Sequence, residues 1–82
     1  MSYIKAVMPL KNYRLFMEME SGSSVIVDLS CKLDTVKYGE LRDKRLFQNV
    51  RTDGDYVYWG DNQVKVTARE LLSVVLIGEV DI

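Results

Sequence analysis

The sequence predicts an α+β fold: a small antiparallel sheet of about five or six strands, a short connecting helix and a C-terminal helix. Segments 13–20 and 24–30 alternate between apolar and polar residues, and the turn-forming tripeptide 21–23 joins them. Such alternation is typical of paired strands with one buried face. A helical period of apolar residues follows Thr67. Together the two patterns indicate the fold class.

The chain has 82 residues, of which 48% are hydrophobic and 28% are charged. A chain of this length buries only about 60–65% of its unfolded surface and supports one core, so we expect a single domain, 1–82. Its formal charge is -1, with 11 basic and 12 acidic residues. This balance gives no overall attraction to phosphate or to an anionic membrane.

The N-terminal part predicts three strands. Residues 2–8 form the first, which Pro9 ends because proline cannot donate to a ladder. One face of this strand carries Ile4, Ala6 and Met8. The hairpin 13–20 and 24–30 follows, with Gly22 supplying the positive φ of its turn. Its core face comprises Tyr13, Leu15, Met17, Met19, Val25, Val27 and Leu29.

The middle of the chain is less regular. The conformation of 31–40 stays open, although Leu33, Val36 and Tyr38 suit a turn over the sheet edge. Asp43 is a suitable N-cap for a short helix through about Asn49, because its carboxylate can accept from early backbone amides. The further strands expected are 50–52, 56–59 and 63–66, separated by the turns 53–55 and 60–62.

The C-terminal part predicts a helix. Residues 67–70 (Thr-Ala-Arg-Glu) have the form of a capping box. An apolar stripe with helical spacing follows, and Gly78 is a suitable stop after the last turn. The stripe consists of Ala68, Leu71, Leu72, Val75 and Leu76.

Several short motifs, taken in order, resemble the bacterial family catalogued as domain of unknown function 2442. They lie at 3–10, 13–15, 27–30 and 41–50, and are followed by an aromatic strand ending in Trp59 and by the helix start at Thr67. The resemblance implies a small prokaryotic α+β domain, sometimes joined to a helix-turn-helix region, and implies no established reaction. Lys65 and Ala68 stand where such proteins often have an aspartate and a proline.

Catalytic residue types are scarce, and we predict that the protein is not an enzyme and has no cofactor. There is no histidine, and Cys31 has no histidine to act as its base. The best carboxylate candidates, Glu18, Glu20 and Asp28, lie on outward strand faces, where charges keep a sheet soluble. The turn residues Asp53, Asp55, Asp61 and Asn62 do not have calcium-loop spacing, so we predict no metal site.

One local concentration of basic residues provides an alternative function, a nucleic-acid-associated regulator. It comprises Lys37, Arg42, Lys44 and Arg45. A local patch of this kind is enough for phosphate contact. The charges of a solvated helix exterior explain the same residues, and no docking motif accompanies them.

Surplus apolar residues favour a protein-interaction or regulatory module, with a protein partner or self-association. Phe16 and Ile26 form a cross-strand pair on the polar side of the hairpin, unless the final helix covers that face. The full set of predicted contact residues is Phe16, Ile26, Tyr56, Tyr58, Ile77, Val80 and Ile82. A lone cysteine, and the absence of a signal-peptide pattern or of a run of about 18 apolar residues, favour the cytoplasm and no membrane association.

Overall fold

The computed structural model describes residues 3–73 and 76–81, which contain seven strands, two short α-helices and three 3-10 turns. The strands are β1 (Ile4–Pro9), β2 (Arg14–Met19), β3 (Ser23–Asp28), β4 (Val50–Thr52), β5 (Tyr56–Trp59), β6 (Val64–Thr67) and β7 (Leu76–Asp81). The helices are α1 (Lys44–Gln48) and α2 (Ala68–Leu72), and the 3-10 turns are η1 (Lys11–Tyr13), η2 (Ser30–Lys32) and η3 (Gly39–Arg42).

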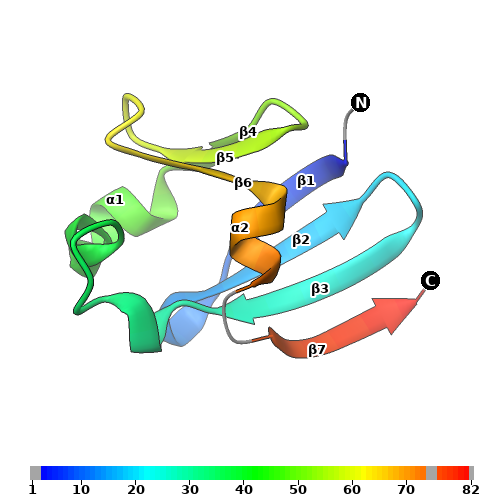
Figure 1. Ribbon diagram of the computed structural model, residues 1–82, viewed down its shortest axis with the longest axis horizontal. Coiled ribbons are helices and arrows are strands. Elements are labelled where there is room, and N and C mark those ends of the chain that lie inside the picture. Colours follow the sequence, from blue (N-terminus) through cyan, green and yellow to red (C-terminus); the bar gives the residue numbers. More distant parts are fainter. Residues whose placement is uncertain (1–2, 74–75, 82) are drawn as a thin grey trace.

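The strands form two antiparallel sheets that lie one above the other (Figure 1). The first sheet has the order β1-β2-β3-β7, and the second has the order β4-β5-β6. They meet at one side, where the backbone N–H groups of Tyr3 and Ile4 both donate to the carbonyl of Gly54, at 2.9 Å. The α+β class and the antiparallel pairing are therefore confirmed, and the expected single sheet of five or six strands is wrong.

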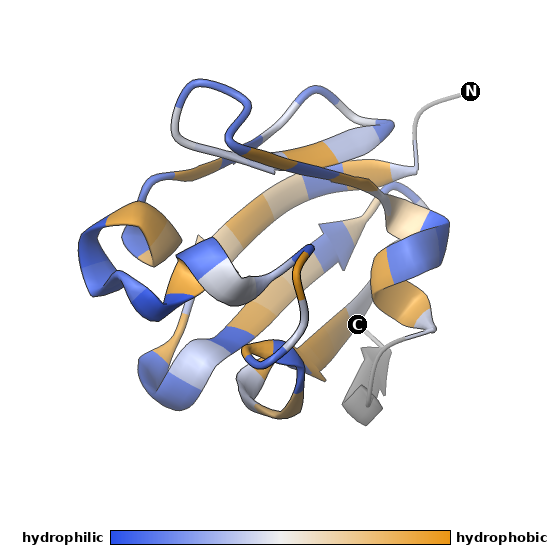
Figure 2. Ribbon diagram, turned by 60° about the vertical axis from the view of Figure 1, so that its left-hand side comes forward, coloured by the Kyte–Doolittle hydropathy of each residue, from blue (hydrophilic) through white to orange (hydrophobic). Residues whose placement is uncertain are grey.

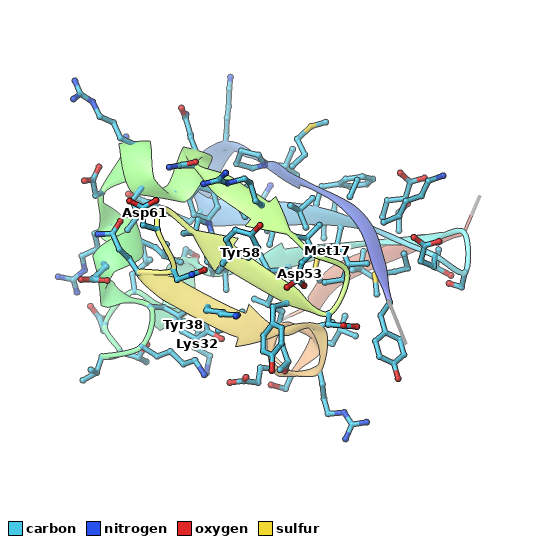
Figure 3. The ribbon with its side chains drawn as sticks, turned by 90° about the horizontal axis from the view of Figure 1, so that it is seen from above. Met17, Lys32, Tyr38, Asp53, Tyr58 and Asp61 are labelled. Carbon is cyan, nitrogen blue, oxygen red and sulfur yellow. The ribbon has the colours of Figure 1, made fainter. Side chains whose placement is uncertain are left out.

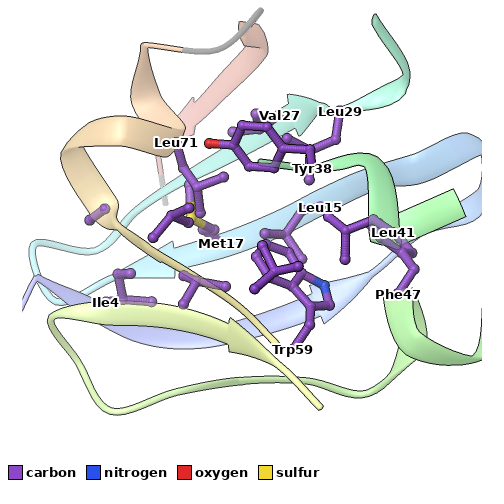
Figure 4. Close-up of a cluster of buried hydrophobic side chains, with 14 of the residues drawn as sticks. Ile4, Leu15, Met17, Val27, Leu29, Tyr38, Leu41, Phe47, Trp59 and Leu71 are labelled. Carbon is purple, nitrogen blue, oxygen red and sulfur yellow. The ribbon is translucent and has the colours of Figure 1, made fainter. Parts of the chain in front are cut away.

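The core fills the space between the sheets and accounts for their separation. Alternate residues of both sheets point into this space, and the cluster is closed by Leu41, Phe47 and Leu71 from the helical segments (Figure 4). Its largest member, Trp59, is fully buried, so the indole is part of the core rather than a surface contact. Burying apolar surface on both inner faces stabilises two packed layers better than one flat sheet.

The central hairpin forms as predicted. Strands β2 and β3 pair with Phe16 opposite Ile26, and Gly22 adopts a φ of 95° in the turn. Leu15, Met17 and Val27 are fully buried, so the predicted core face is confirmed at these positions. The hydropathy of the ribbon accordingly alternates along the strands (Figure 2).

The first strand differs from a regular alternation. Its register against β2 shifts between Ile4 and Ala6, so that Ile4 is buried whereas Ala6 and Met8 are exposed. The expectation that these three residues share a face is wrong, because an extra residue in one strand turns the following side chains to the other side. The bulge thereby places Met8 on the outer face of the first sheet.

The chain segment that connects the first sheet to the second consists mainly of tight turns and the short helix α1. Asp43 caps α1 as predicted, since its carboxylate accepts from the backbone N–H of Arg45 at 2.9 Å. Tyr38 is buried and Leu33 packs against the core, whereas Val36 is fully exposed and does not cover the sheet edge.

The C-terminal helix is shorter than predicted. Its capping box is present, with Glu70 N–H donating to the Thr67 hydroxyl at 3.1 Å, but α2 ends at Leu72. Leu76 and Gly78, expected in the stripe and at the stop, lie in β7, which pairs with β3. The edge of β3 offers a full row of backbone partners, and Gly78 is a poor residue for continuing a helix, so strand pairing overrides the helical period. Val75 lies outside the described residues.

Candidate functional site

The outer face of the first sheet carries a row of apolar side chains that crosses three strands. The register places Met8 opposite Phe16, and Phe16 opposite Ile26. Met8 is 55% exposed, and Phe16 and Ile26 are half-buried. We call these three residues the apolar row. Side chains directly opposite each other on one sheet face lie within contact distance, so the row is one continuous surface.

Helix α2 does not cover the apolar row. Ala68 and Leu71 of this helix are buried in the core, and Leu71 lies beside Met17 on the inner side of the first sheet (Figure 4). The second sheet lies on the same inner side (Figure 1). The alternative that the C-terminal helix shields Phe16 and Ile26 is therefore wrong.

Charged side chains of opposite sign flank the apolar row. Along β2, Arg14 and Glu18 are each two residues from Phe16, on opposite sides of it. Glu18 lies 4.0 Å from the ammonium of Lys5, and Arg14 is paired in register with Asp28. The hydroxyl and backbone N–H of Ser30 lower the pKa of Asp28 by hydrogen bonding, and Arg14 contributes in the same direction.

The outer face of the second sheet also carries aromatic side chains, but each lies against a cation. The guanidinium of Arg51 lies 5.8 Å from the ring centre of Tyr58, and the ammonium of Lys65 lies 4.5 Å from that of Tyr56. Figure 3 looks down on this sheet and labels Tyr58 and, in the β4–β5 turn, Asp53. The adjacent turn adds a carboxylate whose pKa is lowered, because Asp53 accepts from the backbone N–H groups of Tyr56 and Asp55.

The predicted protein-contact residues therefore do not form one surface. Phe16 and Ile26 belong to the first sheet, whereas Tyr56 and Tyr58 lie on the outer face of the second. Ile77 and Val80 are in β7, where only the backbone is described, and Ile82 lies outside the described residues. Tyr56 keeps 39% of its surface exposed beside Lys65.

Of the four basic residues considered for nucleic-acid contact, two form ion pairs with carboxylates and two, within the described part of the chain, do not. Lys37 forms an ion pair with Glu70, and Arg42 forms one with Asp34. The Lys37 contact is also the largest cause of the lowered pKa of Glu70. Lys44 and Arg45 remain exposed on α1. Each of the first two cations thus already faces a carboxylate, which weakens the positive potential available to phosphate.

The predicted carboxylate candidates do not converge. Glu18 is paired with Ser24, and Asp28 with Arg14, so these two acids lie at opposite ends of the hairpin, and Glu20 is exposed beyond the end of β2. Within residues 3–73 and 76–81, no three side chains of His, Cys, Asp or Glu come close enough together to hold a metal ion. In the same ranges, no helix is long and apolar enough to cross a membrane.

Sequence reasoning missed Met8 as a surface residue and Lys11 as a pocket residue. Lys11 lines a pocket beside α1, together with Asn12, Tyr13 and Lys44. An Asn before an aromatic residue in a short strand connection is a weak sign of left-handed backbone. The bulge that exposes Met8 has no such sign in the sequence.

Comparison of the chain with protein-family models, with curated proteins and with solved structures finds no match. The resemblance to the domain of unknown function 2442 family therefore stays a prediction. The functional argument rests on the geometry of the chain itself.

Proposed function

We propose that the protein is a self-associating interaction module whose contact surface is the apolar row. The observation that carries the proposal is the alignment of Met8, Phe16 and Ile26 on a sheet face that α2 leaves uncovered. A cross-strand apolar surface rimmed by charged residues is typical of a protein contact site.

The charges beside the row favour a second copy of this chain as the partner. Arg14 and Glu18 each lie about 7 Å from Phe16 along β2, at the usual rise per residue of a strand. A two-fold axis along the apolar row stacks each row on its counterpart and sets Arg14 of one chain against Glu18 of the other. Both copies then use the same patch, and each charged residue faces one of opposite sign on the other copy. A two-fold interface requires such self-complementarity.

The other simple two-fold arrangement is disfavoured. With the axis along the strands, Glu18 would face Glu18 of the other copy and Arg14 would face Arg14. Like charges juxtaposed across an interface cost several kcal/mol. Charge therefore selects one docking geometry.

The interface is small, so we expect a weak and reversible dimer. The apolar row comprises only three side chains, two of them half-buried, so the contact belongs to the small interfaces of transient associations. Dissociation constants at micromolar concentration or above are usual for such small interfaces.

A charge-swap experiment tests the proposal. We expect the natural chain to show a mass that rises reversibly with concentration in sedimentation equilibrium, and Arg14→Glu and Glu18→Arg each to shift it toward the monomer. An equimolar mixture of the two variants should associate again, because every facing pair is then of opposite charge.

Arg45→Glu is the matched control, since it makes the same charge change at an exposed position of α1 rather than on either sheet. It should dimerise like the natural chain. A monomer at all concentrations, or a mixture no more associated than the separate variants, would contradict the proposal. The near-ultraviolet circular dichroism of Trp59, buried in the core, checks that each variant is folded.

A further inference from the structure

A pocket of about 560 Å³ opens at the end of the hairpin, between the β1–β2 connection and α1. This volume is within the ~300–1,000 Å³ of small-molecule sites. Its lining residues fall into an apolar group and a polar group. They are Leu10, Tyr13 and Phe47, and Lys11, Asn12, Ser30, Lys44 and Gln48.

The charged residues of the lining are two lysines and no acid. Within residues 3–73 and 76–81, neither Lys11 nor Lys44 forms an ion pair. The nearest carboxylates in sequence to the pocket residues already bind backbone groups: Asp28 accepts from Ser30 N–H and Asp43 from Arg45 N–H, both at 2.9 Å. In the described part of the chain, no carboxylate therefore lies within ion-pair distance of either lysine.

The wall between the lysines has a fixed and unusual backbone. Asn12 and Tyr13 have φ values of 62° and 61°, a left-handed conformation that costs energy in residues with a Cβ. Three contacts hold Tyr13 in this conformation. Its hydroxyl donates to the carbonyl of Arg42 at 2.7 Å, its ring lies edge-on to Phe47 at 5.3 Å, and its carbonyl accepts from Leu29 N–H at 2.9 Å.

The ring that Tyr13 contacts, Phe47, links the pocket to the core. Phe47 is buried, and its other neighbour is Trp59, with ring centres 6.5 Å apart. The apolar wall is therefore held by packing on both sides, while the two lysines of the lining are exposed to solvent. A rigid apolar wall with polar groups at its edge fits a ligand with an apolar body and a charged end.

We propose that this pocket binds a small organic anion, a carboxylate or a phosphate monoester carried on an apolar body. Lys11 and Lys44 bind the oxyanion, and the side-chain amides of Asn12 and Gln48 are placed to donate to it. Leu10 and Phe47 contact the apolar body. A dianion gains more from two cations than a monoanion does, so phenyl phosphate should bind more tightly than benzoate.

The test is a titration of the 82-residue chain with benzoate and with phenyl phosphate, followed by amide chemical shifts. We expect saturable shifts that centre on residues 10–13 and 44–48, with dissociation constants in the millimolar range. Lys11→Ala and Lys44→Ala should each weaken phenyl phosphate about threefold to tenfold, the loss that corresponds to one hydrogen bond of ordinary net strength at an exposed position. Lys32→Ala is the control, because Lys32 lies outside the pocket and should not change the affinity.

Two further probes separate the contributions of charge and apolar body. Benzamide has the ring without the charge and should bind clearly more weakly than benzoate, while inorganic phosphate should bind more weakly than phenyl phosphate. Equal binding of benzamide and benzoate would overturn the role of the lysines. Absence of saturable shifts with either anion, or unchanged affinity in both lysine variants, would overturn the site itself.

Discussion

The outer faces of the two sheets both carry large apolar or aromatic side chains, but their charged neighbours are arranged differently. On the second sheet, Tyr56 and Tyr58 each lie against a cation from a neighbouring strand. On the first sheet, Met8, Phe16 and Ile26 lie side by side, and the charged residues Arg14 and Glu18 flank the row along β2. A cation over an aromatic ring stays hydrated while it covers apolar surface, so the second face is suited to water. Among the described side chains, no cation lies over the ring of Phe16 on the first face, and this difference supports the proposal that the apolar row is the contact surface.

The largest predicted effect is a difference in stability loss between alanine substitutions at two neighbouring positions of β2. Met17 is fully buried and Phe16 is half-buried on the outer side. Met17→Ala should lower the free energy of unfolding by about 2–5 kcal/mol because it leaves a cavity in the core. Phe16→Ala should cost only about 1 kcal/mol, as partly exposed residues do. Urea denaturation followed by Trp59 fluorescence measures both. Equal losses would mean that Phe16 is a core residue, and the difference between the two faces would disappear.

The next largest effect is a difference in stability loss between glycine substitutions in the turns of the two sheets. Gly22 and Gly60 both have positive φ, at 95° and 62°. A Cβ at Gly22 meets nothing within 4 Å, whereas one at Gly60 would lie 2.8 Å from Cδ1 of Leu46. Gly22→Ala should therefore cost about 1 kcal/mol, from the left-handed backbone alone. Gly60→Ala should cost at least about 1 kcal/mol more because it also displaces the side chains of Leu46 and Gln63.

Thermal unfolding of the two glycine variants measures this difference. Gly39→Ala is a suitable control, because its added Cβ would make only an ordinary contact, 3.5 Å from the Leu33 carbonyl oxygen. Equal destabilisation at Gly22 and Gly60 would show that the second sheet can shift at its turn and is less rigid than its packing indicates.

How far the sequence predicts the structure depends on how local the determining interaction is. The β2–β3 hairpin and the caps at Asp43 and Thr67 follow from a few neighbouring residues, and they form as predicted. The division into two sheets depends on which strand edges meet in space, which local pattern does not specify. The same holds for β7, where the free edge of β3 outweighs a helical period.

The candidate site shows the same limit. The alternation of β2 and β3 predicts that Phe16 and Ile26 lie opposite each other on the outer face. It cannot predict that Met8 joins them, because the bulge after Ile4 changes the face of the strand. Nor does it predict the pocket, which brings Lys11 and Lys44 together from segments over thirty residues apart.

A smaller effect concerns the cations that cover the second sheet. Lys65→Met keeps the length of the side chain but removes the charge above Tyr56. We expect a loss of about 0.5–1 kcal/mol in the free energy of unfolding, the usual value of an exposed cation–π contact. The uncovered tyrosine should also make the chain more prone to associate through the second sheet. Arg69→Met, which removes a charge without a ring contact to Tyr56, is the control, and an equal loss in both variants would contradict the role of the contact.

The smallest predicted effect is on how the stability of the chain depends on pH, through a carboxylate in the β4–β5 turn of the second sheet. The backbone N–H groups of Tyr56 and Asp55 hold the pKa of Asp53 below its usual value of 3.8. A carboxyl group with a lowered pKa in the folded state stabilises the fold above its unfolded pKa, and that contribution is lost as the pH falls through the folded pKa. Asp53→Asn should therefore lower the melting temperature slightly at neutral pH, and its curve should converge with that of the natural chain in acid. Asp61→Asn, in the next turn, controls for the loss of a turn carboxylate. A constant difference between natural chain and variant from neutral pH down to acid would show that the charge of Asp53 does not secure the β4–β5 turn.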